Sequence, residues 1–159
     1  MDESKNNILN SAFVDFDLYA IPESEFDYQE IKPHDDFSGT LIMTDIPNNV
    51  GEEWDSLVGL LTKICQSVGL ELGSNTTHIN IKPETRFKFN KLPKSLKLKR
   101  LIVFGPTPDD LGMRLEIKSY QLVKWNTVDL IFVDSLGIIK EDVEKKKLLW
   151  SLLKQLFAK

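Results

Sequence analysis

The chain of 159 residues contains one cysteine and two histidines, which limits the chemistry open to it. Cys65 alone excludes an internal disulfide and a cysteine-rich zinc cluster, and two histidines supply few ligands for a metal site or a catalytic triad. The net charge is −4, but residues 1–38 hold ten acidic residues and two lysines, whereas residues 82–100 hold eight basic residues and one glutamate. We therefore expect no metal and no cofactor, and a surface on which charge is unevenly distributed.

The first 38 residues differ in composition from the rest of the chain. Apolar side chains stand between aspartates as far as Pro22, and residues 23–38 are acidic and rich in turn formers. We divide the chain into an acidic arm, residues 1–38, and an α/β domain, residues 39–159. The arm either lies over its own domain or is a docking peptide that orders on a partner.

Targeting and membrane signals do not stand out in the sequence. The first ten residues are acidic and polar, unlike a secretory leader. The longest apolar runs, such as residues 101–104 and 130–133, have the length of a strand rather than of a membrane span. These features predict a cytoplasmic protein outside the membrane.

From residue 39 onward, short apolar runs alternate with amphipathic stretches. Residues 40–45 predict a buried strand that is closed by Pro47. In residues 52–68 apolar side chains recur at steps of three and four, which predicts a helix ending near Gly69. Residues 78–81 predict a brief strand.

The second half of the chain continues this alternation, after a helical turn expected near residues 84–89. Residues 101–104 predict another buried strand, residues 114–124 and 128–133 predict two extended segments joined by a turn, and residues 141–157 predict a helix with a broad apolar face. Strands of this kind require a sheet that is covered on both faces. We predict an α/β fold, a three-layer sandwich with a small, mostly parallel or mixed sheet flanked by helices.

The predicted topology places four polar side chains at the carboxyl edge of the sheet: Asp45, Thr107, Asp134 and Ser135. Open α/β sheets bind ligands at this edge, and such oxygen ligands suit a hard cation or a phosphate. The same residue types are also ordinary at turns and helix caps. Neither a phosphate-binding glycine motif nor a serine-nucleophile elbow occurs. A nucleotide- or ligand-binding domain, with or without enzymatic activity, is therefore the second hypothesis, and a non-enzymatic binding protein is the first.

The basic segment, residues 82–100, raises the question of nucleic acid, because lysines there alternate with Phe87 and Phe89. Proteins that bind single strands combine a basic groove with exposed aromatic rings. The alternative is that both rings face the core and the lysines form the solvated side, which the acidic charge of the whole protein favours. His78 falls inside a predicted strand, and we interpret it as a structural histidine.

Taken in order, these segments resemble the psi subunit of the bacterial DNA polymerase III clamp-loader assembly. The resemblance rests on Leu-Ile-Met-Thr-Asp-Ile-Pro at 41–47 before a long helix, Val-Asp-Ser-Leu at 133–136, Lys-Leu-Leu-Trp at 147–150 in the last helix, and the style of the arm over 8–22. It implies a non-enzymatic bridging subunit. In that family the arm docks on the clamp loader, and the domain holds a second small subunit, chi, which contacts single-stranded DNA-binding protein. The resemblance implies that the docking contacts of this chain are Ile8, Leu9, Phe13, Phe16, Leu18 and Tyr19.

Overall fold

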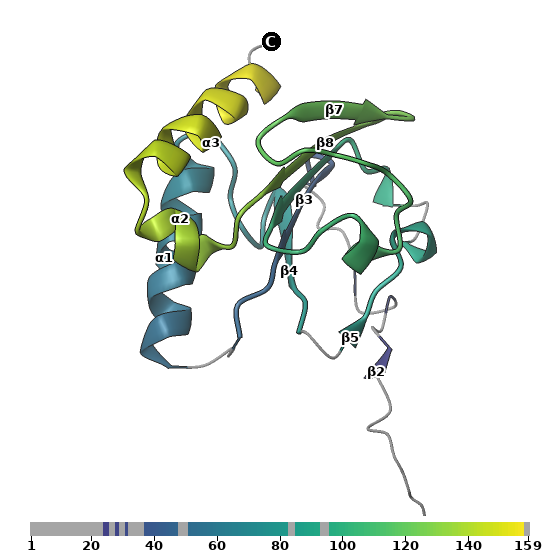
Figure 1. Ribbon diagram of the computed structural model, residues 1–159, viewed down its shortest axis with the longest axis horizontal. Coiled ribbons are helices and arrows are strands. Elements are labelled where there is room, and N and C mark those ends of the chain that lie inside the picture. The colour runs from purple at the N-terminus through teal and green to yellow at the C-terminus, as the bar shows by residue number, and fades with distance from the viewer. Residues whose placement is uncertain are drawn as a thin grey trace, which may run out of the picture.

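The computed structural model shows a twisted sheet with helices packed along one side (Figure 1). The structure describes residues 24–25, 28, 31, 37–47, 51–82, 85–92 and 96–157. The apolar part of the arm that was predicted to dock on a partner, residues 8–21, lies outside this part of the chain.

The main sheet has five strands: β3 Thr40–Thr44, β4 Thr76–Asn80, β6 Arg100–Phe104, β7 Leu122–Trp125 and β8 Val128–Val133. Their spatial order is β4-β3-β6-β8-β7, with β7 antiparallel to β8 and the other pairs parallel. The chain places β4 on one side of β3 and then β6 on the other side. The point at which the strand order reverses, where such sheets bind ligands, therefore lies between β3 and β6.

The strands of the sheet centre are buried on both faces. In β6, Ile102 and Phe104 belong to the apolar cluster under the helices, whereas Leu101 and Val103 belong to a second cluster on the opposite face. Successive side chains of a strand point to opposite faces, so a strand covered on both sides must be apolar at every position. This explains why β3, β6 and β8 could be predicted as continuous apolar runs.

Three α-helices cover the first face (Figure 1): α1 Glu52–Gln66, α2 Leu136–Lys140 and α3 Val143–Leu156. The first turn of α1 is acidic and its last turn carries Lys63, which matches the helix dipole. The α3 helix begins after Asp142, whose carboxylate accepts a hydrogen bond from the Lys145 backbone N–H at 3.1 Å. None of the helices in the described residues is long and apolar enough to span a membrane.

Short elements cover the second face: β2 Ser24–Glu25, β5 Thr85–Arg86 and the 3-10 helices η2 Phe89–Lys91 and η4 Asp109–Leu111. The β2 and β5 strands pair in parallel. The Lys88 backbone N–H donates to the Tyr28 hydroxyl at 2.6 Å, and the Tyr28 ring packs against Phe87 with 5.4 Å between centroids. Ile31 is buried in the same cluster. These described residues of the predicted arm therefore pack on the domain.

The predicted α/β class, with a mostly parallel mixed sheet flanked by helices, is confirmed. The helical turn expected near residues 84–89 is wrong: Arg86, Phe87 and Lys88 alternate exposed, buried, exposed, because Phe87 must reach the core from an extended segment. Residues 114–118 alternate in burial as a strand would, but they join no ladder, and β7 begins only at Leu122.

Candidate functional site

The four polar side chains predicted at the carboxyl edge of the sheet line one cavity of about 320 Å³, here called the strand-end cavity. Asp45 follows β3, Thr107 lies beyond β6, and the pair Asp134 and Ser135 follows β8. The cavity therefore opens at the switch point between β3 and β6, where the parallel strands bring together residues that are distant in sequence. Whether a ligand binds there stays a prediction.

Thr107 already serves the loop that follows β6. Its backbone N–H donates to Asp110 Oδ2 at 2.8 Å, and its Oγ1 accepts a hydrogen bond from the Asp110 N–H at 3.2 Å. This reciprocal pair stabilises the start of η4 in the manner of a capping box. Ser135 is the residue before α2, and its side chain makes no capping hydrogen bond. The hydroxyl of Thr107 therefore has a structural role, whereas that of Ser135 faces the cavity without one.

Asp134 is held by two neighbours on the other wall of the cavity. Its Oδ2 accepts a hydrogen bond from the Tyr120 hydroxyl at 2.8 Å and lies 2.9 Å from Lys145 Nζ. The hydrogen bond and charge of Lys145 keep the pKa of Asp134 below its ordinary value, even though burial acts in the opposite direction. Burial and the bond to Asp134 together raise the pKa of Tyr120 to about 12. Asp134 is thus an ionised anchor for α3 rather than a free ligand group.

Asp45 is the carboxylate of the strand-end cavity that makes neither an ion pair nor a side-chain hydrogen bond within the described residues. It is half-buried, and burial, followed by repulsion from Asp110, raises its pKa against a backbone hydrogen bond that lowers it. Its carboxylate lies directly over Gly105, since a Cβ at that position would clash with the Asp45 carboxylate. Glycine is therefore needed where the two strand ends meet.

The charges around the strand-end cavity disfavour an anionic ligand. Asp45 and Asp134 line it, Asp110 lies near enough to Asp45 to repel its charge, and Lys145 is already paired with Asp134. Pro106 and Pro108 in its lining have no backbone N–H to offer to a phosphate. A ligand here would have to supply hydrogen-bond donors or positive charge. No group of three or more potential metal ligands comes together within the described residues.

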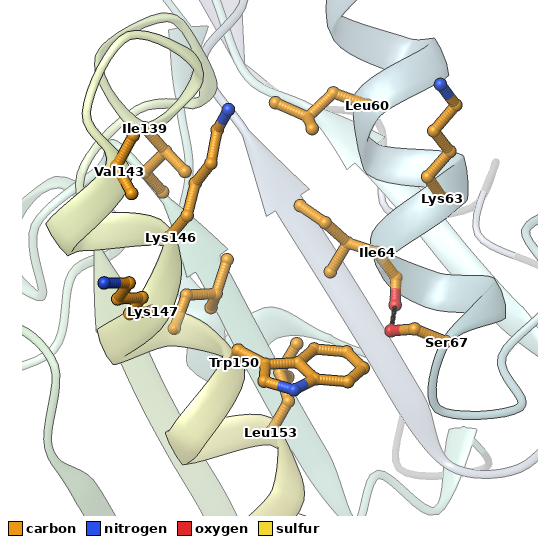
Figure 2. Close-up of a pocket in the computed structure, with 11 residues that line it drawn as sticks. Leu60, Lys63, Ile64, Ser67, Ile139, Val143, Lys146, Lys147, Trp150 and Leu153 are labelled. Carbon is orange, nitrogen blue, oxygen red and sulfur yellow. Dashed lines mark hydrogen bonds between the residues drawn. The ribbon is translucent and has the colours of Figure 1, made fainter.

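A second cavity, of about 390 Å³, lies between α1 and α3 and is here called the α1/α3 groove (Figure 2). Leu60 and Ile64 of α1 form one wall, and Val143 and Trp150 of α3 form the other, above the buried Leu153. Figure 2 shows the Trp150 ring reaching from α3 toward the end of α1. The groove is almost wholly apolar at its base, although it opens on the surface.

Large apolar side chains on α3 are exposed, and two of them line this groove. Val143 is 63% exposed and Trp150 is 39% exposed, whereas Leu148, which is 51% exposed, is not part of the groove lining. Single exposed apolar residues are common in proteins, but several on one helix beside an apolar groove mark a surface that contacts another molecule. The indole N–H of Trp150 also offers a hydrogen-bond donor at the rim, as aromatic side chains at protein interfaces often do.

The charged side chains that line the α1/α3 groove are all lysines: Lys63 on α1, and Lys146 and Lys147 on α3 (Figure 2). Lys154 adds a further positive charge, with its Nζ 5.5 Å from the centroid of the Trp150 ring. Glu144 approaches Lys147 only at 4.0 Å on the exposed surface, where such pairs are weak. The rim is therefore positive although the whole protein is acidic.

The width of the apolar face of the last helix is a sequence feature that indicates this groove. The apolar face of the last helix was recognised, but Val143, Leu148 and Trp150 make it wider than the stripe that Leu149 and Leu153 bury on the sheet. When the apolar face of a helix is wider than the part buried in the protein's own core, the remaining apolar side chains are free to contact another molecule. Its pairing with α1, however, is a property of the folded chain.

The basic segment does not present aromatic rings for base stacking. Phe87 is 2% exposed, and Phe89 is partly buried against Trp125, with 5.5 Å between ring centroids. The described lysines of this segment, such as Lys88 and Lys91, are exposed. The arrangement supports the interpretation in which the rings complete the core and the lysines form the solvated side.

His78 belongs to a partly buried polar network at the ends of β3 and β4. Its Nε2 lies 2.8 Å from Thr44 Oγ1, and the Thr44 hydroxyl donates to Asn80 Oδ1 at 2.7 Å. Since that hydroxyl has one hydrogen, it accepts from His78, whose Nε2 carries the proton of the neutral ring. Asn80 in turn binds both the N–H and the C=O of Ile46, at 2.8 and 3.0 Å. Burial lowers the pKa of His78 to about 4, which agrees with a structural role.

Comparison with known proteins gives no family for this chain. No protein-family model matches the sequence, and no curated protein matches it significantly. The two cavities are therefore the features that indicate its function. The arm side chains between Ile8 and Tyr19, which were predicted to dock on a partner, lie outside the described residues and stay a prediction.

Proposed function

We propose that this protein is a non-enzymatic protein-binding subunit and that the α1/α3 groove is its docking surface. The observation that carries the proposal is the apolar base of the groove beside exposed Val143 and Trp150. Burying such side chains on a partner removes apolar area from water, and tryptophan is among the residues that dominate interface energy. The lysines of the rim add charge complementarity, which favours selection of an acidic partner.

The biological setting that we propose is a bridging role like that of the psi subunit. The arm would contact a clamp loader through Phe16 and Tyr19 as its main anchors, and the groove would hold a second, small subunit. The support for this setting is the sequence resemblance alone. The groove proposal does not depend on it, because the groove follows from the geometry of α1 and α3.

Capture of partners from the native cell tests this function. We expect tagged protein carrying Trp150→Glu to recover one partner at a level about tenfold or more below the wild type, because a charge then stands where an apolar anchor is buried. Leu122→Glu is the matched control: Leu122 is 38% exposed, almost the same as the 39% of Trp150, but lies on the edge strand β7. Quantitative mass spectrometry of both eluates gives the answer. Equal recovery of every protein by the two variants would remove the groove from the proposal.

A second candidate function is the binding of a small molecule in the strand-end cavity. It is favoured by Asp45, a half-buried carboxylate without an ion-pair partner in the described part of the chain, placed at the switch point of the sheet. The surrounding charge restricts such a ligand to a cationic or hydroxyl-rich compound. Asp134 and Thr107 already have internal partners, which leaves this function with fewer free groups than the sequence predicted.

A further inference from the structure

The α1/α3 groove and the N-terminal arm have complementary chemistry within one sequence. We propose that the groove binds residues 8–21 of a second copy of this chain, so that two copies form a reciprocal dimer. This inference rests on the proposed function, since it takes the groove to be a docking surface. The dimer is the state that forms when no other partner occupies the groove. A partner of similar chemistry would then compete with the dimer for the same groove.

Charge is the first reason for this choice of occupant. Residues 8–21 contain Asp15 and Asp17 and no basic residue, and the remainder of residues 1–38 is strongly acidic. The groove lining contains three lysines and no acidic residue among the residues described. Opposite charges across an interface steer association and set the orientation of the bound segment. A basic or neutral segment would lack this attraction.

The spacing of apolar residues in the arm is the second reason. Leu9, Phe13 and Phe16 are separated by four and three residues, so a helical segment presents them on one face. Asp15 and Asp17 stand on either side of Phe16 in the sequence, and on a helix they flank that face. Helices with such anchors typically bind in apolar grooves.

The lysines of the groove are distributed to match this arrangement. Lys63 projects from α1 on one wall, and Lys146 and Lys147 project from α3 on the other (Figure 2). An apolar face seated between the helices would therefore bring one aspartate near each wall. The apolar stems of the lysines also extend the walls of the groove, while their charged ends stay in water.

The length of the arm favours a second copy over the chain's own groove. Ser24 pairs with Thr85, beside Phe87, which is buried on the second face of the sheet. Leu60 and Ile64 of the groove pack on the opposite face. Residue 21 can lie at most about 11 Å from Ser24, because a fully extended chain advances roughly 3.6 Å per residue. If residues 8–21 fill the groove over their whole length, these three residues would have to pass around the sheet to the other face, whereas the arm of another copy has no such constraint.

Sedimentation velocity of the full chain tests the dimer, across micromolar concentrations and at low and high salt. We expect a monomer–dimer equilibrium that weakens as salt rises, because charge pairs at the groove rim are screened. The arm variant Phe13→Ser/Phe16→Ser and the groove variant Trp150→Glu should each weaken dimerisation about tenfold or more. The control Leu122→Glu should associate as the wild type does. A wild type that stays monomeric, or a dimer that survives the arm substitutions, would overturn the inference.

Charge exchange separates a specific contact from a change in net charge. Asp15→Lys/Asp17→Lys in the arm and Lys63→Asp/Lys146→Asp in the groove should each weaken the dimer, and the chain carrying all four changes should regain it. Failure of the combined chain to recover would count against the contact. This experiment and the partner capture have separate outcomes. If the wild type is monomeric but Trp150→Glu loses a partner in the capture, the proposed function stands and the dimer does not. If Trp150→Glu loses the dimer but captures every partner normally, only the dimer stands.

Discussion

Replacement of Gly105 with alanine is expected to lower the free energy of unfolding by about 2 kcal/mol, mainly through backbone strain. Gly105 has φ +110°, where a residue with a side chain is strained, and this strain alone costs roughly 1–3 kcal/mol. The added Cβ would also clash with the Asp45 carboxylate, which is the end of a side chain and can rotate away at small cost. Urea unfolding of the two proteins measures the difference.

A control variant and a double variant separate the backbone strain at Gly105 from the clash with Asp45. Gly59→Ala, in α1, places a Cβ where no atom lies within 4 Å, and it should stabilise the helix by about 0.5–1 kcal/mol. Asp45→Ala combined with Gly105→Ala removes the clash but keeps the strained φ, so it should recover only a small part of the loss. A Gly105→Ala protein as stable as the wild type would contradict the strained backbone at the β6 strand end.

Acidification is expected to remove about 3 kcal/mol of stability through His78 alone. The pKa of His78 is about 4 in the folded protein and 6.5 in an unfolded chain. Between these pH values the unfolded chain binds the proton and the folded protein does not, so protonation favours unfolding. The contribution is complete above pH 6.5, falls as the pH drops through this window, and is lost below pH 4.

The variant His78→Gln isolates this effect, because glutamine does not titrate and keeps a donor for Thr44 Oγ1. Chemical unfolding of both proteins at several pH values gives the difference in stability as a function of pH. Carboxyl groups such as Asp134, whose pKa is also altered, titrate in both proteins and cancel in that difference. Parallel curves for the two proteins from pH 7 to pH 4 would contradict a buried neutral His78.

The centre of the fold was predictable because its signals are local. β3 and β8 each contain an unbroken apolar run, residues 41–43 and 130–133, since both faces are covered, and α1 carries its core residues at helical steps. The rules of sheet topology then predicted which strand ends meet, and local patterns alone could not predict this. Asp45 and Asp134 are distant in sequence, yet parallel strands place both on the strand-end cavity, as predicted.

What the sequence could not show depends on contacts between distant segments. α2 has only five residues, too few for a helical period, and β2 pairs with β5 through residues that have no apolar pattern. Lys145 lies 2.9 Å from Asp134, a pairing that the pattern of the last helix does not indicate. The α1/α3 groove likewise exists because α1 and α3 leave a space between them, and no spacing within either helix determines that space.

The most direct test of the central claim is carbene footprinting of the full chain, alone and bound to the partner that is recovered with the wild type but not with Trp150→Glu. We predict that labelling of Val143 and Trp150 falls several-fold in the complex, because the partner covers the α1/α3 groove, while labelling of Leu122 on β7 stays unchanged. Unchanged labelling of Val143 and Trp150 in the complex would contradict the assignment of the α1/α3 groove as the docking surface.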